Sequence, residues 1–203
     1  DKVSKRFHLA STWLTGIGAS ISAIWILIAN SWMQYPVGME FNPDTMRNEM
    51  VDFMAVAFSP VAVNKFFHTV LSCWILGAVF VVGVSCWYLI KKREKEFAMA
   101  SIKVASIVGL VSSLLTSFTG DQSAYQVAQV QPMKLAAMEA LYDGCSCAPL
   151  TVVGPIEIPK MLSFLATHST DGFVPGINDL MNGGYKLSDG TVALSADEKI
   201  ERG

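Results

Sequence analysis

Three apolar runs dominate the sequence, and each of them is long enough to cross a lipid bilayer. They cover residues 9–33, 66–90 and 99–118. A helix that crosses the hydrocarbon core needs about 20 apolar residues, and its backbone groups must be hydrogen-bonded within the segment. Hydrophobic residues make up 52% of the chain and charged residues only 16%, which is too few charges for the surface of a soluble domain. The sequence therefore predicts an all-α membrane protein built on a bundle of three transmembrane helices.

Basic residues near the ends of these runs predict how the helices are oriented, because cytoplasmic loops are enriched in Lys and Arg. Residues 91–95 contain four basic side chains, and three more precede the first run. The 34–65 segment holds two basic side chains and four acidic ones. We therefore expect the N-terminus and the 91–96 turn in the cytoplasm. The 34–65 segment and everything after about residue 119 should be extracytoplasmic.

The sequence divides into a transmembrane region, residues 1–119, and a long, partly irregular extracytoplasmic loop, residues 120–203. Between residues 46 and 57, apolar side chains recur at helical spacing, which predicts an interfacial helix over about 43–58. Within the loop, short helices are expected at 160–167 and 178–181.

The two ends of the sequence and its charge add two further expectations. The first residue is not Met and the last residues are polar, which predicts an internal fragment of a longer polypeptide, without a signal peptide. The net charge of −2 provides no basic face for phosphate groups, so nucleic acid is not an expected partner.

Polar side chains follow one face of the first predicted span. At about 100° per residue they fall within a sector of about 100°, and they are His8, Ser11, Thr12, Thr15, Ser22 and Asn30. Polar groups are costly in hydrocarbon, so this face is expected to point inward, towards protein or water. Close helix packing explains such a stripe. A wall that conducts protons, with His8 at its cytoplasmic mouth, explains it as well.

A single imidazole, His68, lies at the outer end of the second predicted span, in the sequence FFHT. A His near a membrane interface is often only a hydrogen-bonded polar group. The face below it is apolar with small residues that leave room for a flat macrocycle, namely Ser72, Ile75, Val79 and Gly83. A neutral imidazole binds haem iron well, so His68 is a candidate haem ligand that would need a second ligand from elsewhere.

Two charged side chains stand out in the segment that follows the third span, GDQSAYQVAQVQPMKLAAMEALYDG. Lys134 and Glu139 lie five positions apart, hence about 140° apart on a helix, which is too far round for an ordinary ion pair. Two solvated charges on a surface helix have this spacing. The two could also converge on a ligand that lies across the helix, one as a cation or donor and the other as a base.

The cysteines and His168 give weaker indications of function. Cys73 and Cys86 share a span but lie about 220° apart around its axis, so they cannot pair. Cys145 and Cys147 form a C-x-C pattern, which is weak as a metal site without partner ligands. His168 lies in the loop and is interpreted as a surface residue.

Several long motifs occur in a fixed order, WILIANSWMQYPVG, NPDTMRNEMVDF, VNKFFHTV and GDQSAYQVAQVQPMKLAAMEA. Through them, residues 1–143 resemble subunit I of the cytochrome bd quinol oxidases, and a weaker similarity continues in FLATHSTDGFVPGINDLMNGG. The resemblance implies part of the haem-bearing subunit of a terminal quinol:oxygen oxidoreductase in the bacterial cytoplasmic membrane. It further implies that quinol is oxidised at the outer loop and that electrons pass through low-spin haem b to oxygen-reducing haems. Protons would be taken from the cytoplasm.

The resemblance also implies roles for individual residues. His68 matches an axial ligand of low-spin haem b, whose other ligand is a Met outside this chain. Lys134 and Glu139 match the KLAAxE motif, whose charged residues take part in quinol oxidation. Ser22 matches a Ser on a proton route, and His8 matches a family His. The ligands of high-spin haem b and haem d are expected largely outside these residues.

The implied partners are subunit II of the oxidase, a small single-span subunit, the lipid bilayer, oxygen and a quinol. Ubiquinol and menaquinol both fit the sequence, as do haem d and an all-b haem set. The competing function class is a membrane helix bundle without a redox role, such as a transporter-like fragment. Such a bundle needs neither His68 nor the KLAAxE motif, so these two features discriminate between the classes.

Overall fold

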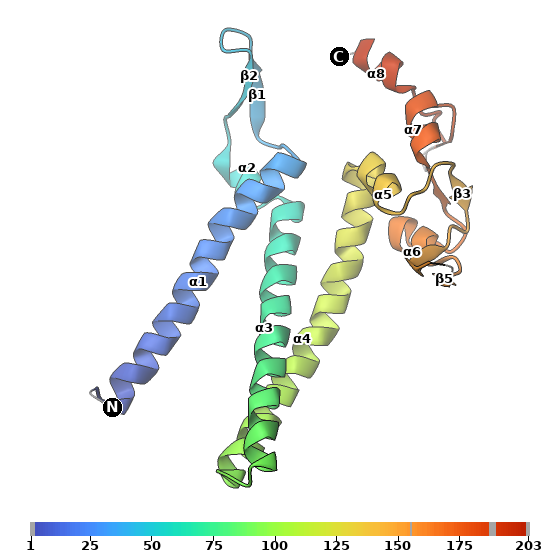
Figure 1. The fold of residues 1–203 in the computed structure, drawn as a ribbon. Coiled ribbons are helices and arrows are strands. Elements are labelled where there is room, and N and C mark those ends of the chain that lie inside the picture. Colours follow the sequence, from blue (N-terminus) through green and yellow to red (C-terminus); the bar gives the residue numbers. More distant parts are fainter. Residues whose placement is uncertain (1–2, 155, 187–189, 202–203) are drawn as a thin grey trace. The chain divides into compact units, whose positions relative to one another are not determined.

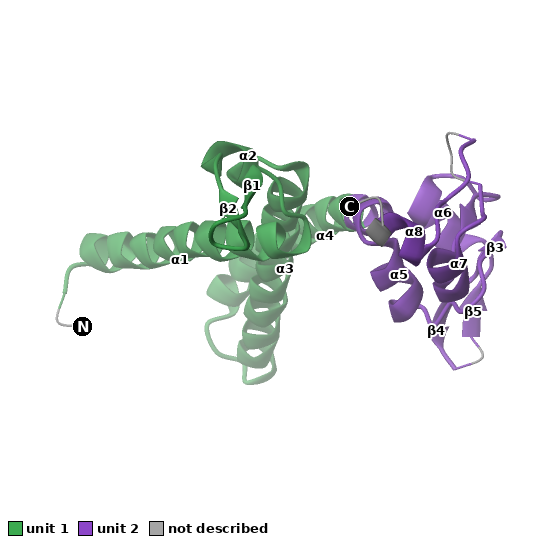
Figure 2. Ribbon diagram, turned by 90° about the horizontal axis from the view of Figure 1, so that it is seen from above, with its two compact units in different colours: residues 1–120 green, residues 121–203 purple. Residues whose placement is uncertain are grey.

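The computed structural model describes residues 3–154, 156–186 and 190–201 (Figure 1). These residues form two compact units, which are coloured separately in Figure 2. Unit 1 comprises Asp1–Gly120 and unit 2 comprises Asp121–Gly203.

Three long helices form the frame of unit 1. They are α1 (Lys5–Gln34), α3 (Pro60–Ile90) and α4 (Lys95–Val130), and the last turns of α4 belong to unit 2. The Ser4 and Ser59 hydroxyls accept backbone N–H bonds at the N-termini of α1 and α3. All three helices are long and apolar enough to cross a membrane, which confirms the predicted all-α membrane fold.

Small side chains line the contact between α3 and α4. Ala78 of α3 and Ser112 of α4 are buried, and a Cβ added to Gly109 would lie 3.2 Å from the Ala78 Cβ. Small residues of this kind let two helical backbones approach closely. Large apolar side chains instead point outward: Leu76 of α3 is 71% exposed and Leu114 of α4 is 66% exposed. Such faces suit contact with lipid or with further helices.

An antiparallel hairpin follows α1, in which β1 (Met39–Asn42) pairs with β2 (Arg47–Met50). Only then does the short helix α2 (Phe53–Ala57) begin. The Asp52 carboxylate caps it by accepting two backbone N–H bonds at 2.9 and 3.1 Å. The helix predicted over about 43–58 is therefore wrong for its first ten residues and right only for its last turns.

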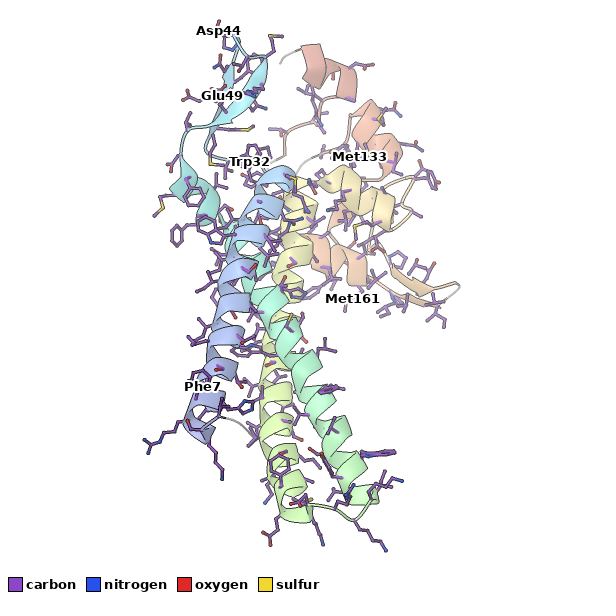
Figure 3. All side chains as sticks on the ribbon, turned by 60° about the vertical axis from the view of Figure 1, so that its left-hand side comes forward. Phe7, Trp32, Asp44, Glu49, Met133 and Met161 are labelled. Carbon is purple, nitrogen blue, oxygen red and sulfur yellow. The ribbon has the colours of Figure 1, made fainter. Side chains whose placement is uncertain are left out.

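Local side-chain chemistry explains the hairpin. Asn42 Oδ1 accepts the Asp44 N–H at 2.9 Å, and the Glu49 carboxylate accepts bonds from the side chains of Asn42 (3.1 Å) and Thr45 (2.9 Å). Figure 3 shows Asp44 at the tip of the hairpin and Glu49 on its strand. Met46 has a φ of 53°, a left-handed conformation that interrupts a helix. Asn and Asp side chains that bond nearby backbone compete with helix formation, and here they prevail over the apolar periodicity.

Unit 2 consists of short elements around a small apolar core. After α4, its helices are α5 (Pro132–Met138), α6 (Met161–Thr167), α7 (Ile177–Asn182) and α8 (Ala196–Glu201). Its strands pair antiparallel, β3 (Cys145–Ser146) with β6 (Phe173–Val174) and β4 (Leu150–Val153) with β5 (Ile156–Ile158). The buried core residues are Ala148, Leu162, Ala166 and Val174. Helices α6 and α7 match the two predicted short helices, whereas the strands were not predicted.

Candidate functional site

His68 lies on α3, where this helix contacts α4 at Thr119 within unit 1. Its imidazole is half-buried, and Nδ1 is 3.0 Å from the Thr119 Oγ1 atom. One turn earlier on α3, the Asn64 amide donates to the Thr119 carbonyl oxygen at 3.2 Å. The ring packs beside Gly120 of α4, where an added Cβ would lie 3.4 Å from His68 Cε1, at the close end of van der Waals contact. Within the described part of the chain, His68 Nε2 makes no hydrogen bond to protein.

A second polar contact joins α3 to α1. The Lys65 ammonium donates to Gln34 Oε1 at 2.7 Å and to Asn30 Oδ1 at 3.2 Å, and the Gln34 amide also donates to Asn30 Oδ1 at 3.2 Å. The sequence indicated Asn30 as part of the polar stripe but gave no sign that Lys65 would bond to it. The pairing depends on how α1 and α3 are aligned, which periodicity does not specify.

Apart from Asn30, the side chains of the predicted polar stripe on α1 are mostly exposed in this chain. His8 and Ser22 are both exposed. Three hydroxyls of the stripe, on Ser11, Thr12 and Thr15, donate to carbonyl oxygens one turn earlier on α1 itself. Among the described residues of the stripe, Asn30 bonds to another helix, and the direction in which the others face stays a prediction.

In unit 2, Glu139 directly follows α5 and borders an apolar cavity of about 260 Å³. The carboxylate is partly buried. Apart from Glu139 and Ser123, the cavity lining is apolar, and it comprises Ala124, Val127, Leu135, Met138, Leu150, Leu162, Leu165 and Ala166. Cavities of this type, with few polar groups in an apolar wall, are typical of small-molecule sites.

Lys134 lies on α5 but does not line the cavity that Glu139 borders. It is exposed and lines a separate recess of about 540 Å³, together with Pro132, Leu180 and Lys199. The structure therefore places Lys134 and Glu139 in different recesses, in line with the wide angle predicted between them. A ligand in contact with both would have to lie across α5.

His168 makes specific contacts that the sequence did not reveal. It ends α6, and its Nε2 lies 3.3 Å from Asp121 Oδ2 at the start of unit 2. Its ring stacks on Tyr125, with centroids 4.3 Å apart and planes at 10°. The interpretation of His168 as a plain surface residue is thus incomplete, because its side chain is 40% exposed but also contacts the Asp121 carboxylate and stacks on the Tyr125 ring. The one available signal was the four-residue spacing of Asp121 and Tyr125, which places both on one helix face.

Cys147, which is half-buried, contacts two exposed charged side chains. Its thiol donates to Asp171 Oδ1 at 3.2 Å, and Lys160 Nζ donates to the same oxygen at 3.1 Å. The hydrogen bond to Asp171 raises the pKa of the Cys147 thiol, and the same contact lowers the pKa of Asp171. Cys73, Cys86, Cys145 and Cys147 are all free thiols. Among the residues described, His, Cys, Asp and Glu form no group of three or more that could hold a metal ion.

Comparison with known proteins decides the family. The family model for cytochrome bd terminal oxidase subunit I matches residues 1–196. The chain belongs to this family. A cytochrome bd-II ubiquinol oxidase subunit 1 from Escherichia coli (strain K12) is 42% identical over 216 aligned positions, which cover 100% of this chain and 42% of the relative. A cytochrome bd ubiquinol oxidase subunit 1 from Bacillus subtilis (strain 168) is 36% identical over 192 positions, which cover 89% of this chain and 41% of the relative.

The match confirms the resemblance of the sequence to cytochrome bd subunit I, and it extends over all the candidate residues. The chain spans about two-fifths of the length of these relatives. Neither the family match nor the relatives' names assign a role to His8, Ser22, His68, Lys134 or Glu139.

Proposed function

We propose that this chain is part of the haem-bearing subunit of a terminal quinol:oxygen oxidoreductase of the bacterial cytoplasmic membrane. Quinol is oxidised at residues of unit 2, electrons pass through low-spin haem b to the oxygen-reducing haems, and protons come from the cytoplasm. Membership of the cytochrome bd subunit I family and the ubiquinol oxidase names of two relatives support this proposal. The partners are subunit II, a small single-span subunit, quinol and oxygen.

The observation that carries the proposal is how the two nitrogens of the His68 imidazole are bonded. Haem iron is commonly held by a neutral imidazole nitrogen whose partner nitrogen is hydrogen-bonded. His68 fits this requirement, since Nδ1 lies 3.0 Å from Thr119 Oγ1 and Nε2 has no protein partner within the described residues. His68 would therefore hold low-spin haem b through Nε2, with a Met outside this chain as the second ligand. When bound, the haem supplies one-electron transfer.

Glu139 is the proposed proton acceptor in quinol oxidation. A general base must lie within hydrogen-bond reach of the hydroxyl proton that it removes. The apolar walls of the Glu139 cavity suit the ring of a quinol, and the carboxylate is the only ionisable group among the described residues that line it. Lys134 would stabilise the negative charge that develops on a quinol oxygen, provided that the quinol lies across α5 between the two recesses.

His8 and Ser22 are proposed to belong to the route for protons from the cytoplasm. Both side chains are exposed on α1 in this chain, so they are available to helices in the rest of the same subunit or to water. Polar groups in a membrane span commonly mark such pathways. Basic residues around α1 and the α3–α4 turn support the orientation that places this end of α1 in the cytoplasm.

The deciding experiment uses the complete oxidase with its partner subunits, purified with the substitution His68→Ala. We expect the reduced-minus-oxidised optical spectrum to lose the low-spin haem b signal, while the other haem signals remain and quinol oxidation stops. His168→Ala is the matched control, because it removes an imidazole from unit 2 and should leave the low-spin signal intact. A low-spin signal that survives in His68→Ala would show that His68 is not the haem ligand, and it would remove the observation on which the proposal rests.

A further inference from the structure

We propose that Thr119 is the positioning residue of His68, and that its hydroxyl determines which imidazole nitrogen faces the haem iron and how strongly that nitrogen donates. This inference rests on the proposed role of His68 as a haem ligand. It concerns residues of α3 and α4 within unit 1 only.

Two hydrogen bonds fix Thr119 against α3. Its carbonyl oxygen accepts from the Asn64 amide at 3.2 Å, and its Oγ1 atom lies 3.0 Å from His68 Nδ1. Asn64 and His68 are four residues apart, so they lie on one face of α3 and hold the same residue of α4 from two points. The ring also packs beside the adjoining Gly120, where an added Cβ would lie 3.4 Å from His68 Cε1.

The position of the hydroxyl proton then sets the imidazole tautomer. A Thr hydroxyl has one proton to donate and two lone pairs that accept. Thr119 Oγ1 lies 3.1 Å from the Leu115 carbonyl oxygen and 3.2 Å from the Thr116 carbonyl oxygen, so two acceptors on the preceding turn of α4 can take its proton, and the proposal assigns the proton to them. Oγ1 is therefore left as an acceptor towards His68, and Nδ1 must carry the ring proton. The Nε2 lone pair is thereby free to bind iron.

The hydrogen bond between His68 Nδ1 and Thr119 Oγ1 also changes the basicity of His68 Nε2. An Nδ1–H group that donates to an oxygen increases the basicity of the opposite nitrogen, and such outer contacts change metal affinity by about 10- to 100-fold. A more basic imidazole stabilises Fe(III) more than Fe(II). Loss of the Thr119 hydroxyl should therefore raise the midpoint potential of low-spin haem b, by about 59 mV for each tenfold weakening of Fe(III) relative to Fe(II) binding.

Thr116 provides a matched control on the same helix. Its hydroxyl oxygen is buried one turn before Thr119 and has no hydrogen-bond partner among the described residues. Thr119→Val and Thr116→Val remove the same group with the same change of shape. The difference between the two variants isolates the bond to His68 from any general effect on packing between α3 and α4.

The test is a potentiometric titration of low-spin haem b in the complete oxidase, followed optically. We expect Thr119→Val to raise the midpoint potential, and Thr119→Ser and Thr116→Val to keep the wild-type value. An unchanged potential in Thr119→Val would overturn the inference, and so would an equal rise in Thr116→Val. If Thr119→Val does not assemble, Thr119→Ala and Thr119→Ser replace it: a rise in Thr119→Ala alone supports the inference, and equal potentials in both overturn it.

His68→Ala, measured in the same series, separates this inference from the proposed function. If His68→Ala keeps the low-spin signal, His68 is not the ligand and the proposed function fails. If His68→Ala loses the signal while Thr119→Val keeps the wild-type potential, the proposed function stands and only the positioning role is refuted.

Discussion

Replacing Asp179 by Asn is expected to loosen unit 2 where the segment after α5 meets α7. Asp179 Oδ2 accepts two backbone N–H bonds, from Gly176 at 2.9 Å and from Gly144 at 2.5 Å. The first closes the N-terminus of α7, and the second ties this helix to the residues just before β3. The Asp179 carboxylate thus adds to the bonds between two segments about 35 positions apart, which the Ile177 N–H also joins by donating to the Leu141 carbonyl oxygen at 2.9 Å.

The size of the effect follows from the charge of the acceptor. Hydrogen bonds to charged groups contribute about 1.5–3 kcal/mol and neutral ones about 0.5–1.5 kcal/mol, so each of the two bonds should weaken by about 1 kcal/mol. The total of about 2 kcal/mol corresponds to a roughly 30-fold larger equilibrium constant for local opening. The Asn side chain has the same shape, so the loss reports charge rather than packing.

Hydrogen–deuterium exchange of the complete oxidase measures this opening directly. In Asp179→Asn, peptides that contain Gly144 and Gly176 should exchange roughly 30-fold faster. Asp143→Asn is the matched control, because Asp143 is exposed and, within the part of the chain that the structure describes, accepts a single side-chain bond, from the Asn178 amide at 2.8 Å. Equal exchange in the two variants would show that the carboxylate of Asp179 does not hold these segments together.

Two further predictions concern other side chains of unit 2. In Asp171→Asn, Cys147 should react faster with iodoacetamide at a given pH, and its rate–pH profile should move to lower pH. The cause is that Asp171 raises the pKa of the thiol in the wild type and thus lowers the fraction of thiolate; an unchanged profile, measured by mass spectrometry, would contradict this. In Glu139→Gln, quinol oxidation by the complete oxidase should fall by about 10²- to 10⁴-fold, the usual contribution of a general base, with the low-spin haem spectrum unchanged. Glu157→Gln, at an exposed position of β5, should have wild-type activity, and full activity in Glu139→Gln would remove Glu139 from the mechanism.

The membrane helices could be predicted from the sequence because a bilayer demands long apolar segments with internally bonded backbones. The end of the third helix could not be predicted in this way. Hydropathy falls after Phe118, yet α4 continues to Val130. The residues that follow include Ala and Gln, which favour a helix without being strongly apolar, so polarity and helix formation diverge here.

The contacts of the candidate site were beyond sequence reasoning for a different reason. His68 and Thr119 are 51 positions apart, and Lys65 and Gln34 are 31 positions apart. Periodicity identifies the face of a helix that a residue occupies, but it does not specify how far one helix is shifted along another. The sequence therefore indicated His68 as a ligand without revealing its hydrogen-bond partner. At the hairpin, the predicted helix was wrong for a local reason, because the turn chemistry of Asn42 and Asp44 prevails over the apolar periodicity.

The backbone at His168 also limits how related sequences can vary. Its φ of 54° lies in the left-handed region, where glycine is relaxed and other residues are strained by about 1–2 kcal/mol. Exchange to Gly would relieve this strain but remove the ring that stacks on Tyr125 and the partner of Asp121. Selection on the backbone alone would favour glycine, so a family member that keeps His here should also keep Asp and an aromatic residue at the matching positions. Members that lose one of the three are free to lose the others.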